Sequence, residues 1–357
     1  MARKRLQIDF NKLPPHEEMT GFIDAARSGD NVAIARFLRR NPVAIDVPVI
    51  HHSYVGFLAL REAAEAGHIS TVALLLSFGA DINARDDMGR SALAGAAGGG
   101  HKDIVELLLK RGADINEADA GRSYSSALAS AASAGHAGIV DLLLERGAIA
   151  DQYALAGASA RGNLGIVNTL LDAGATADDQ SLQRAAWGGH RDVVTRLLDA
   201  GAVADGAALN AAISGGQGAI VTQLLKAGAP VDGDAPVKDP DGVYTGDRTP
   251  LIEAATWGAK PDIIRQLLDA GADINKQNNR GETALMFAVS AGQPGLVKLL
   301  LDNGADPSIR TKEGATALSI TKGHLKVFPD SELLKGNVEL LEQWGKPKFN
   351  GPRGPRP

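Results

Sequence analysis

The 357-residue sequence contains no cysteine, so disulfides and thiolate metal sites are excluded. Aromatic residues make up only 4% of the chain, whereas glycine occurs 42 times. A chain with so few large side chains must build its core from Leu, Ile, Val and closely packed Ala. This composition favours thin stacked layers over one thick core.

The sequence also lacks a basic excess and a long apolar run. Its formal net charge is −5, and its basic residues do not gather into a stripe, which disfavours nucleic acid as a partner. No segment approaches the roughly 20 apolar residues that a membrane span requires, and residues 1–10 lack the apolar stretch of a secretory signal. We therefore expect a cytoplasmic protein that binds neither nucleic acid nor membranes.

A short phrase, a Leu-Leu pair followed by Gly, recurs along most of the chain. The intervals between successive copies are 33, 35, 27, 27, 27, 43 and 33 residues, for the glycines Gly79, Gly112, Gly147, Gly174, Gly201, Gly228, Gly271 and Gly304. Each unit holds an Ala-rich segment and then an apolar segment, such as 103–109, with Ile, Val and Leu at helical spacing. Periods of this size indicate a solenoid of stacked helix–turn–helix units.

These residues resemble the ankyrin repeat. The segment 249–254, Thr-Pro-Leu-Ile-Glu-Ala, is similar to the family's helix-opening phrase Thr-Pro-Leu-His-x-Ala, and the closing phrase Gly-Ala-Asp-Ile-Asn is complete at 79–83, 112–116 and 271–275. The family's histidine is replaced in every copy, by Arg61, Ala94, Ala129, Ile252, Met286 or Ser319. Gly-His turns occur at 67–68, 100–101, 135–136 and 189–190.

The resemblance implies an all-α ankyrin-repeat solenoid of about nine to ten helix–turn–helix repeats over residues 20–345. The first and last repeats would act as caps, residues 1–19 as an N-terminal arm and residues 346–357 as a disordered tail. It also implies a non-enzymatic protein–protein interaction module, monomeric when alone, with another protein or peptide as its partner.

In the ankyrin family a hairpin finger joins each repeat to the next, at one edge of a concave groove. Residues 84–90 fit such a finger, but after Gly147, Gly174 and Gly201 the chain runs almost directly into the next helix. The connection 231–248 is instead unusually long. We expect truncated fingers in the fifth to seventh repeats and one long finger, which together form a notch. The alternative is drift, since helix pairs stack without fingers; even so, loops of unusual length often carry function.

The groove positions inferred from the family pattern are mostly small residues. Six larger or charged side chains stand out, namely Arg161, Arg184, Trp187, Glu253, Trp257 and Phe287. Trp and Arg are enriched at binding hot spots. We therefore expect a partner to bind the concave face near residues 157–290, with the tryptophans as apolar anchors and the arginines as contacts to an acidic group. Two alternatives remain open: the tryptophans pack over Gly-rich turns, or the notch is a small-molecule or catalytic pocket in which Glu253 pairs with Arg184.

Two groups of residues suggest metal binding but do not fit it. Successive repeats stack at roughly 8–10 Å, so the turn histidines His68, His101, His136 and His190 cannot share one ion, and a structural role in the turns is favoured. The aspartates of the long finger do not match the spacing of a calcium loop, which favours a solvated loop. No catalytic or phosphate-binding motif is present. We expect no catalytic residue, no metal site and no cofactor.

Overall fold

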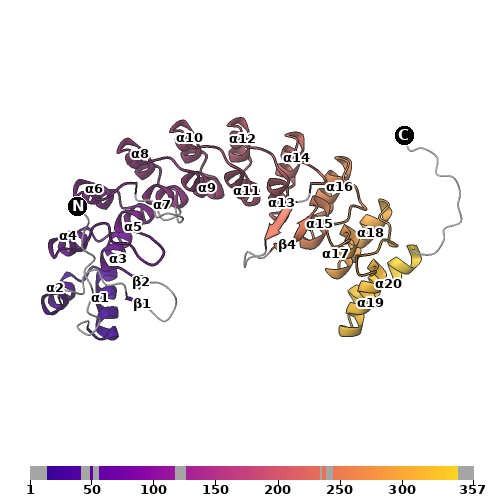
Figure 1. Ribbon diagram of the computed structural model, residues 1–357, viewed down its shortest axis with the longest axis horizontal. Helices are drawn as coiled ribbons and strands as arrows, with labels where there is room; N and C mark the ends of the chain where they lie inside the picture. Colours follow the sequence, from indigo (N-terminus) through magenta and orange to yellow (C-terminus); the bar gives the residue numbers. More distant parts are fainter. Residues whose placement is uncertain are drawn as a thin grey trace. The chain divides into compact units, whose positions relative to one another are not determined.

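The computed structural model describes residues 14–41, 49–50, 56–116, 126–233, 235–238 and 244–344 (Figure 1). It divides into two compact units, unit 1 (residues 1–181) and unit 2 (residues 182–357). The tail 346–357 and most of the arm 1–19 lie outside the described residues, so those two expectations stay predictions.

Unit 1 consists of five helix pairs among its described residues. The helices are α1 (His16–Ser28), α2 (Asn31–Arg40), α3 (Ala59–Glu65), α4 (Ile69–Ser77), α5 (Ala92–Gly99), α6 (Lys102–Lys110), α7 (Ala127–Ala134), α8 (Ala137–Glu145), α9 (Gln152–Arg161) and α10 (Leu164–Asp172). The first helices of the pairs, α1, α3, α5, α7 and α9, contact one another in sequence. The second helices, α2, α4, α6, α8 and α10, form a parallel row beside them (Figure 1).

Unit 2 repeats the same arrangement. Its helices are α12 (Arg191–Asp199), α13 (Gly206–Ser214), α14 (Gly218–Lys226), α15 (Pro250–Trp257), α16 (Pro261–Asp269), α17 (Ala284–Ser290), α18 (Pro294–Asp302), α19 (Ala317–Val327) and α20 (Glu332–Trp344). The boundary between the units falls within α11 (Asp179–Gly188). Helices α13, α15, α17 and α19 contact in succession, as do α12, α14 and α16.

The sequence pattern explains where the helices begin and what they bury. The side chain of Thr249 accepts a hydrogen bond from the N–H of Ile252, and Pro250 occupies the first helical position of α15. In the second helices the Ile, Val and Leu stripe is buried, as in α6, where Ile104, Val105 and Leu108 are fully covered. The predicted helical solenoid is confirmed.

Within the described residues, two short antiparallel strand pairs accompany the helices. β1 (Val49–Ile50) pairs with β2 (Gly56–Phe57) in unit 1, and β3 (Ala235–Lys238) pairs with β4 (Tyr244–Arg248) in unit 2. The second pair is the long finger expected between α14 and α15. The connections 146–151, 173–178 and 200–205 are short beside 78–91, as the deleted fingers predict.

Side chains in the turns connect neighbouring repeats. Nε2 of His101 lies 3.0 Å from the carbonyl oxygen of Glu65 in the preceding repeat, and His68 and His136 make equivalent contacts with Arg27 O and Gly98 O. The imidazole of His101 lies against Gly67, where a Cβ would be 2.5 Å from the ring. These contacts support the structural role predicted for the turn histidines.

Candidate protein-binding surface

The six predicted contact residues differ from one another in their unit and in their exposure to solvent. Arg161 is an exposed residue at the end of α9 in unit 1, while the other five belong to unit 2. Trp187 in α11 and Trp257 in α15 are 64% and 62% exposed. Their exposure shows that neither indole is a core side chain. Arg184 is exposed and Phe287 is half-buried.

Glu253 is only 3% exposed, so it is not a surface charge. Its Oε1 accepts hydrogen bonds from Trp257 Nε1 and from Ser214 Oγ, each at 2.6 Å. Its Oε2 accepts from Arg248 Nη1 at 3.1 Å. Glu253 thus forms an ion pair with Arg248, and its pairing with Arg184, raised only for the pocket alternative, stays a hypothesis. A buried carboxylate that accepts from three donors is well compensated for its lost hydration.

Arg248 links this carboxylate to the next repeat. Its guanidinium carbon lies 5.7 Å from the ring centroid of Phe287 in α17, within cation–π range. Its carbonyl oxygen accepts a hydrogen bond from Asn210 in α13. The contacts therefore connect α13, α15 and α17, and we call Ser214, Arg248, Glu253, Trp257 and Phe287 the Trp257 cluster.

Sequence reasoning missed Arg248 because it lies at the end of the long finger. A signal was available: Thr249 caps α15, so residue 248 must lie just before the first turn, and Glu253 follows one turn later. A positive charge in that position can reach the carboxylate. Ser214 gives no such signal, since it is 39 residues away and meets Glu253 only through the packing of α13 on α15.

Trp187 lies close to the turn that follows α13. A Cβ at Gly215 would be 2.3 Å from the carbonyl oxygen of Trp187, and Gln217 Nε2 lies 3.5 Å from the same oxygen. The end of α11 therefore packs against this turn, and α13 in turn contacts α15. The two exposed tryptophans are thus carried at the C-terminal ends of α11 and α15, with α13 connecting those helices.

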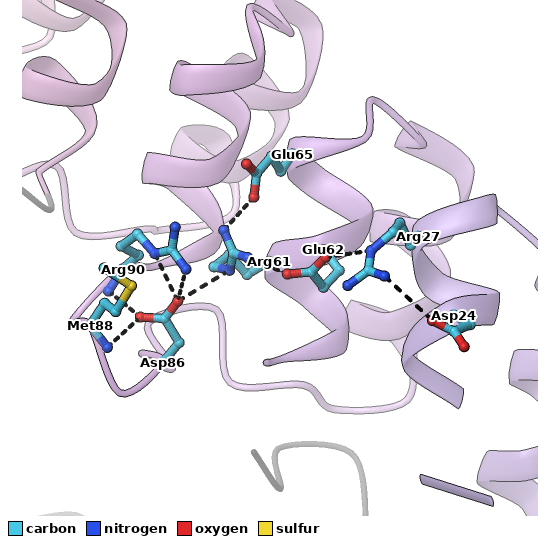
Figure 2. Close-up of polar contacts among 8 residues, drawn as sticks. All are labelled: Asp24, Arg27, Arg61, Glu62, Glu65, Asp86, Met88 and Arg90. Atoms are coloured by element: carbon cyan, nitrogen blue, oxygen red, sulfur yellow. Dashed lines mark hydrogen bonds and ion pairs between the residues drawn. The ribbon is translucent and has the colours of Figure 1, made fainter. Parts of the chain in front are cut away.

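A second polar network, in unit 1, was not expected from the sequence (Figure 2). The carboxylate of Asp86, in the finger 84–90, is fully buried. It accepts from the backbone N–H of Met88 at 2.9 Å and from Arg90 Nε at 2.9 Å, and Arg61 Nε lies 3.3 Å away. Arg61 stands where the family has histidine, and here it connects α3 to the following finger.

The same network continues toward α1. Arg61 also pairs with Glu62 and Glu65, and Arg27 Nε bonds Glu62 Oε2 at 2.9 Å (Figure 2). Acidic and basic groups alternate along the chain of contacts, so each buried charge has an opposite neighbour. The network connects three successive repeats, so we assign it a structural role and not a role in binding.

Three further findings complete the description of the chain. Burial raises the pKa of the Asp151 carboxyl at the N-terminus of α9, although the N–H groups of Ala154 and Tyr153 act in the opposite direction. Within the described ranges, no group of three or more His, Asp or Glu side chains could hold a metal ion. Nor does any helix in that part of the chain have the length and apolar character to cross a membrane.

The family profile described as Ankyrin repeats (3 copies) matches residues 22–119 and, in overlapping ranges, residues 182–278, 209–311 and 251–328. These ranges cover well over half of the sequence. The chain therefore belongs to the ankyrin repeat family, whose repeats are protein–protein interaction modules.

Similar proteins include protein phosphatase 1 regulatory subunit 27 from mouse, 38% identical over 87 residues, and its human counterpart, 37% identical over 87 residues. Each match covers 24% of this chain and 53% of the relative, so the chain spans about half the length of these relatives. Among solved structures, the crystal structure of the human ASB11 ankyrin repeat domain is 24% identical, with a TM-score of 0.42, and the match covers 70% of this chain and 98% of that one.

Proposed function

We propose that this chain is a non-enzymatic scaffold that binds another protein, and that the face of unit 2 carrying Trp187 and Trp257 is its binding surface. The observation that carries the proposal is the exposure of both indoles, 64% and 62%, in a chain with only three tryptophans. Tryptophan is among the residue types most enriched at binding hot spots. Arg184, exposed in α11, adds a charged group to the same unit.

The Trp257 cluster supports this role by fixing one anchor in advance. The hydrogen bond from Trp257 Nε1 to Glu253 Oε1 restrains the indole, and Arg248 in turn restrains Glu253. A side chain held in its binding orientation loses less conformational entropy when a partner docks. Glu253 is therefore a positioning residue. We include Phe287, which lies against Arg248, in the proposed binding surface. Arg161 lies in unit 1, and its role in binding stays a separate prediction.

The relatives suggest one partner to test first. Both carry the name of a protein phosphatase 1 regulatory subunit, and the aligned region spans 87 residues. We propose protein phosphatase 1 as the first candidate partner of this chain. The surface itself requires only a protein or peptide with apolar groups that can cover the indoles and an acidic group for Arg184.

The test is capture of partners on the immobilised full chain, with purified protein phosphatase 1 catalytic subunit as one arm and cell lysate as another. The variant is Trp187→Ala with Trp257→Ala, and the matched control is Phe328→Ala with Leu333→Ala, two other exposed apolar residues of unit 2. Circular dichroism confirms that both variants are folded. We expect a protein that wild type and control retain and that the tryptophan variant loses.

The other outcomes count against the proposal. A partner that the tryptophan variant retains would place the surface elsewhere on the chain. If wild type retains no protein in either arm, the small-molecule alternative replaces the proposal, and a metabolite screen follows.

A further inference from the structure

Helix α4 in unit 1 differs from the other second helices of the described repeats. From Ile69 to Phe78 it carries no charged side chain, whereas α6, at matching positions, has Lys102, Glu106 and Arg111. Ile69 and Phe78 are nonetheless 41% and 38% exposed. The face that elsewhere carries charges is here uncharged, with Ile69 and Phe78 exposed beside Ser70 and Ser77.

A hollow of about 840 Å³ lies between α4 and its neighbour α2. Small or apolar side chains form much of its lining, including Val32, Ala35, Ala73 and Leu74, and Val32 is 68% exposed. The two helices are joined at their N-terminal ends, where Thr71 Oγ1 donates to Asn31 Oδ1 at 2.7 Å. This bond ties α2 to α4 beside the hollow, whose lining also includes the polar side chains of Asn31 and Ser70.

Three arginines complete the lining. Arg36, Arg39 and Arg40 are all exposed, and their spacing puts them on one side of α2. In the part of the chain that the structure describes, no carboxylate forms an ion pair with any of the three. The negative end of the α2 dipole stabilises arginines in the last turn, but it does not explain why all three converge on an apolar hollow.

We infer that the hollow between α2 and α4 binds an acidic amphipathic segment of a partner protein. Apolar side chains of that segment enter between Val32, Ala35 and Ala73, and its carboxylates pair with the arginines. This is the pattern by which a helix with one apolar face docks in a groove. The site lies in unit 1 and is independent of the tryptophan surface of unit 2.

The shape of the site favours a peptide over a membrane. Both an acidic peptide and an anionic lipid surface would be attracted by three arginines. A bilayer, however, is engaged by apolar side chains that protrude. Here Ala35 and Ala73 leave a recess, which a row of side chains on a peptide can fill.

The test selects peptides that bind the full chain from a random library displayed on phage. The peptides are about 12 to 16 residues long, which corresponds to three to four turns of helix. Enriched peptides are synthesised with a fluorophore and titrated by anisotropy against wild type and Arg36→Glu/Arg39→Glu/Arg40→Glu. We expect enriched peptides that are acidic, carry apolar residues at helical spacing and lose affinity about tenfold or more in the charge-reversed variant. Their binding should also weaken with added salt.

Two further variants separate the hollow from general charge effects. Ala73→Glu restores the acidic residue that α6 carries at the matching position, so it should fold and should weaken binding. Arg146→Glu/Arg191→Glu/Lys226→Glu changes the net charge by the same amount at exposed residues away from the hollow and should bind like wild type.

Three results would overturn the inference. One is that no peptide is enriched, and another is that the enriched peptides bind the charge-reversed variant as well as wild type. The third is that vesicles of phosphatidylserine and phosphatidylcholine bind wild type but not the charge-reversed variant while no peptide is enriched, which would assign the hollow to a lipid surface.

Discussion

Glu253 shows how a buried residue can set the position of an exposed one. Its carboxylate accepts from Ser214, Arg248 and Trp257, and only Trp257 of these four is largely open to solvent. The charge is stabilised by Arg248 and the hydrogen bonds occupy both carboxylate oxygens. The stability of unit 2 and the orientation of its indole therefore depend on the same group.

Replacing Glu253 with Gln keeps an oxygen for Trp257 but removes the charge opposite Arg248. We expect the free energy of unfolding to fall by about 1–3 kcal/mol, because Arg248 is left mostly covered without its counter-ion. Urea denaturation followed by circular dichroism measures the effect. Glu332→Gln is the control, since its pair with Lys335 is exposed and contributes little. Equal midpoints for the two variants would contradict the account.

Asp151 gives a prediction for pH. Burial raises its pKa above 3.8, so the folded chain holds this proton more tightly than the unfolded chain. The stabilising contribution of the group is present below the unfolded pKa and is lost as the pH rises through the folded pKa. At neutral pH the ionised carboxylate therefore costs stability.

The change Asp151→Asn keeps an oxygen for the N–H groups of Tyr153 and Ala154 without the buried charge. We expect the Asn variant to be at least as stable as wild type at pH 7, with an advantage that shrinks as the pH falls through the raised pKa. Urea midpoints taken from about pH 7 to pH 3 measure this. If the stability advantage of the Asn variant instead grows as the pH falls, the pKa of Asp151 is not raised in the folded chain.

At the scale of elements, each turn depends on a close approach between neighbours. Gly67 ends α3 with φ of +85°, and the ring of His101 from the next repeat lies against it. The histidine ring occupies the space that a side chain at position 67 would need. Asn163 and Gln217 take the same place against Gly135 and Gly189, so several polar side chains can make this contact.

The pair Gly67→Ala and Gly79→Ala separates backbone strain from this packing. Both glycines have a left-handed φ, but a Cβ at Gly79 would meet nothing within 4 Å. Each change should cost about 1–2 kcal/mol of backbone strain, and Gly67→Ala should cost about 1–2 kcal/mol more through displacement of His101. Thermal and urea unfolding compare the two. If the two variants are equally stable, the imidazole contact does not hold the repeats together.

Sequence reasoning succeeded where structure is local. Helix positions follow from Leu and Ala spacing and from caps such as Thr249, and finger lengths follow from the intervals between glycines. Contacts across repeats were harder to predict. The pairing of Arg61 with Asp86 and of Ser214 with Glu253 depends on how one helix pair packs on the next. Burial of Glu253 was missed for the same reason. The repeat pattern assigns this position to the groove, and its contacts with Arg248 and Ser214 come from other segments of the chain.

At the scale of the whole molecule, the extensive contacts of each helix pair in the described residues are with neighbouring pairs, as in other solenoids. Changes in one repeat should therefore act locally. This organisation allows unit 1 and unit 2 to carry separate binding surfaces. The tryptophan surface and the arginine-lined hollow share no residue, so a partner of one need not affect a partner of the other.

The most direct measurement is calorimetric titration of the captured partner with wild type, Trp187→Ala, Trp257→Ala and the exposed control Phe328→Ala. If the tryptophans anchor the partner, each Trp variant should bind about tenfold or more weakly, as truncated hot-spot residues do. The control should match wild type. Unchanged affinity for both Trp variants would contradict the central claim that this face of unit 2 binds the partner.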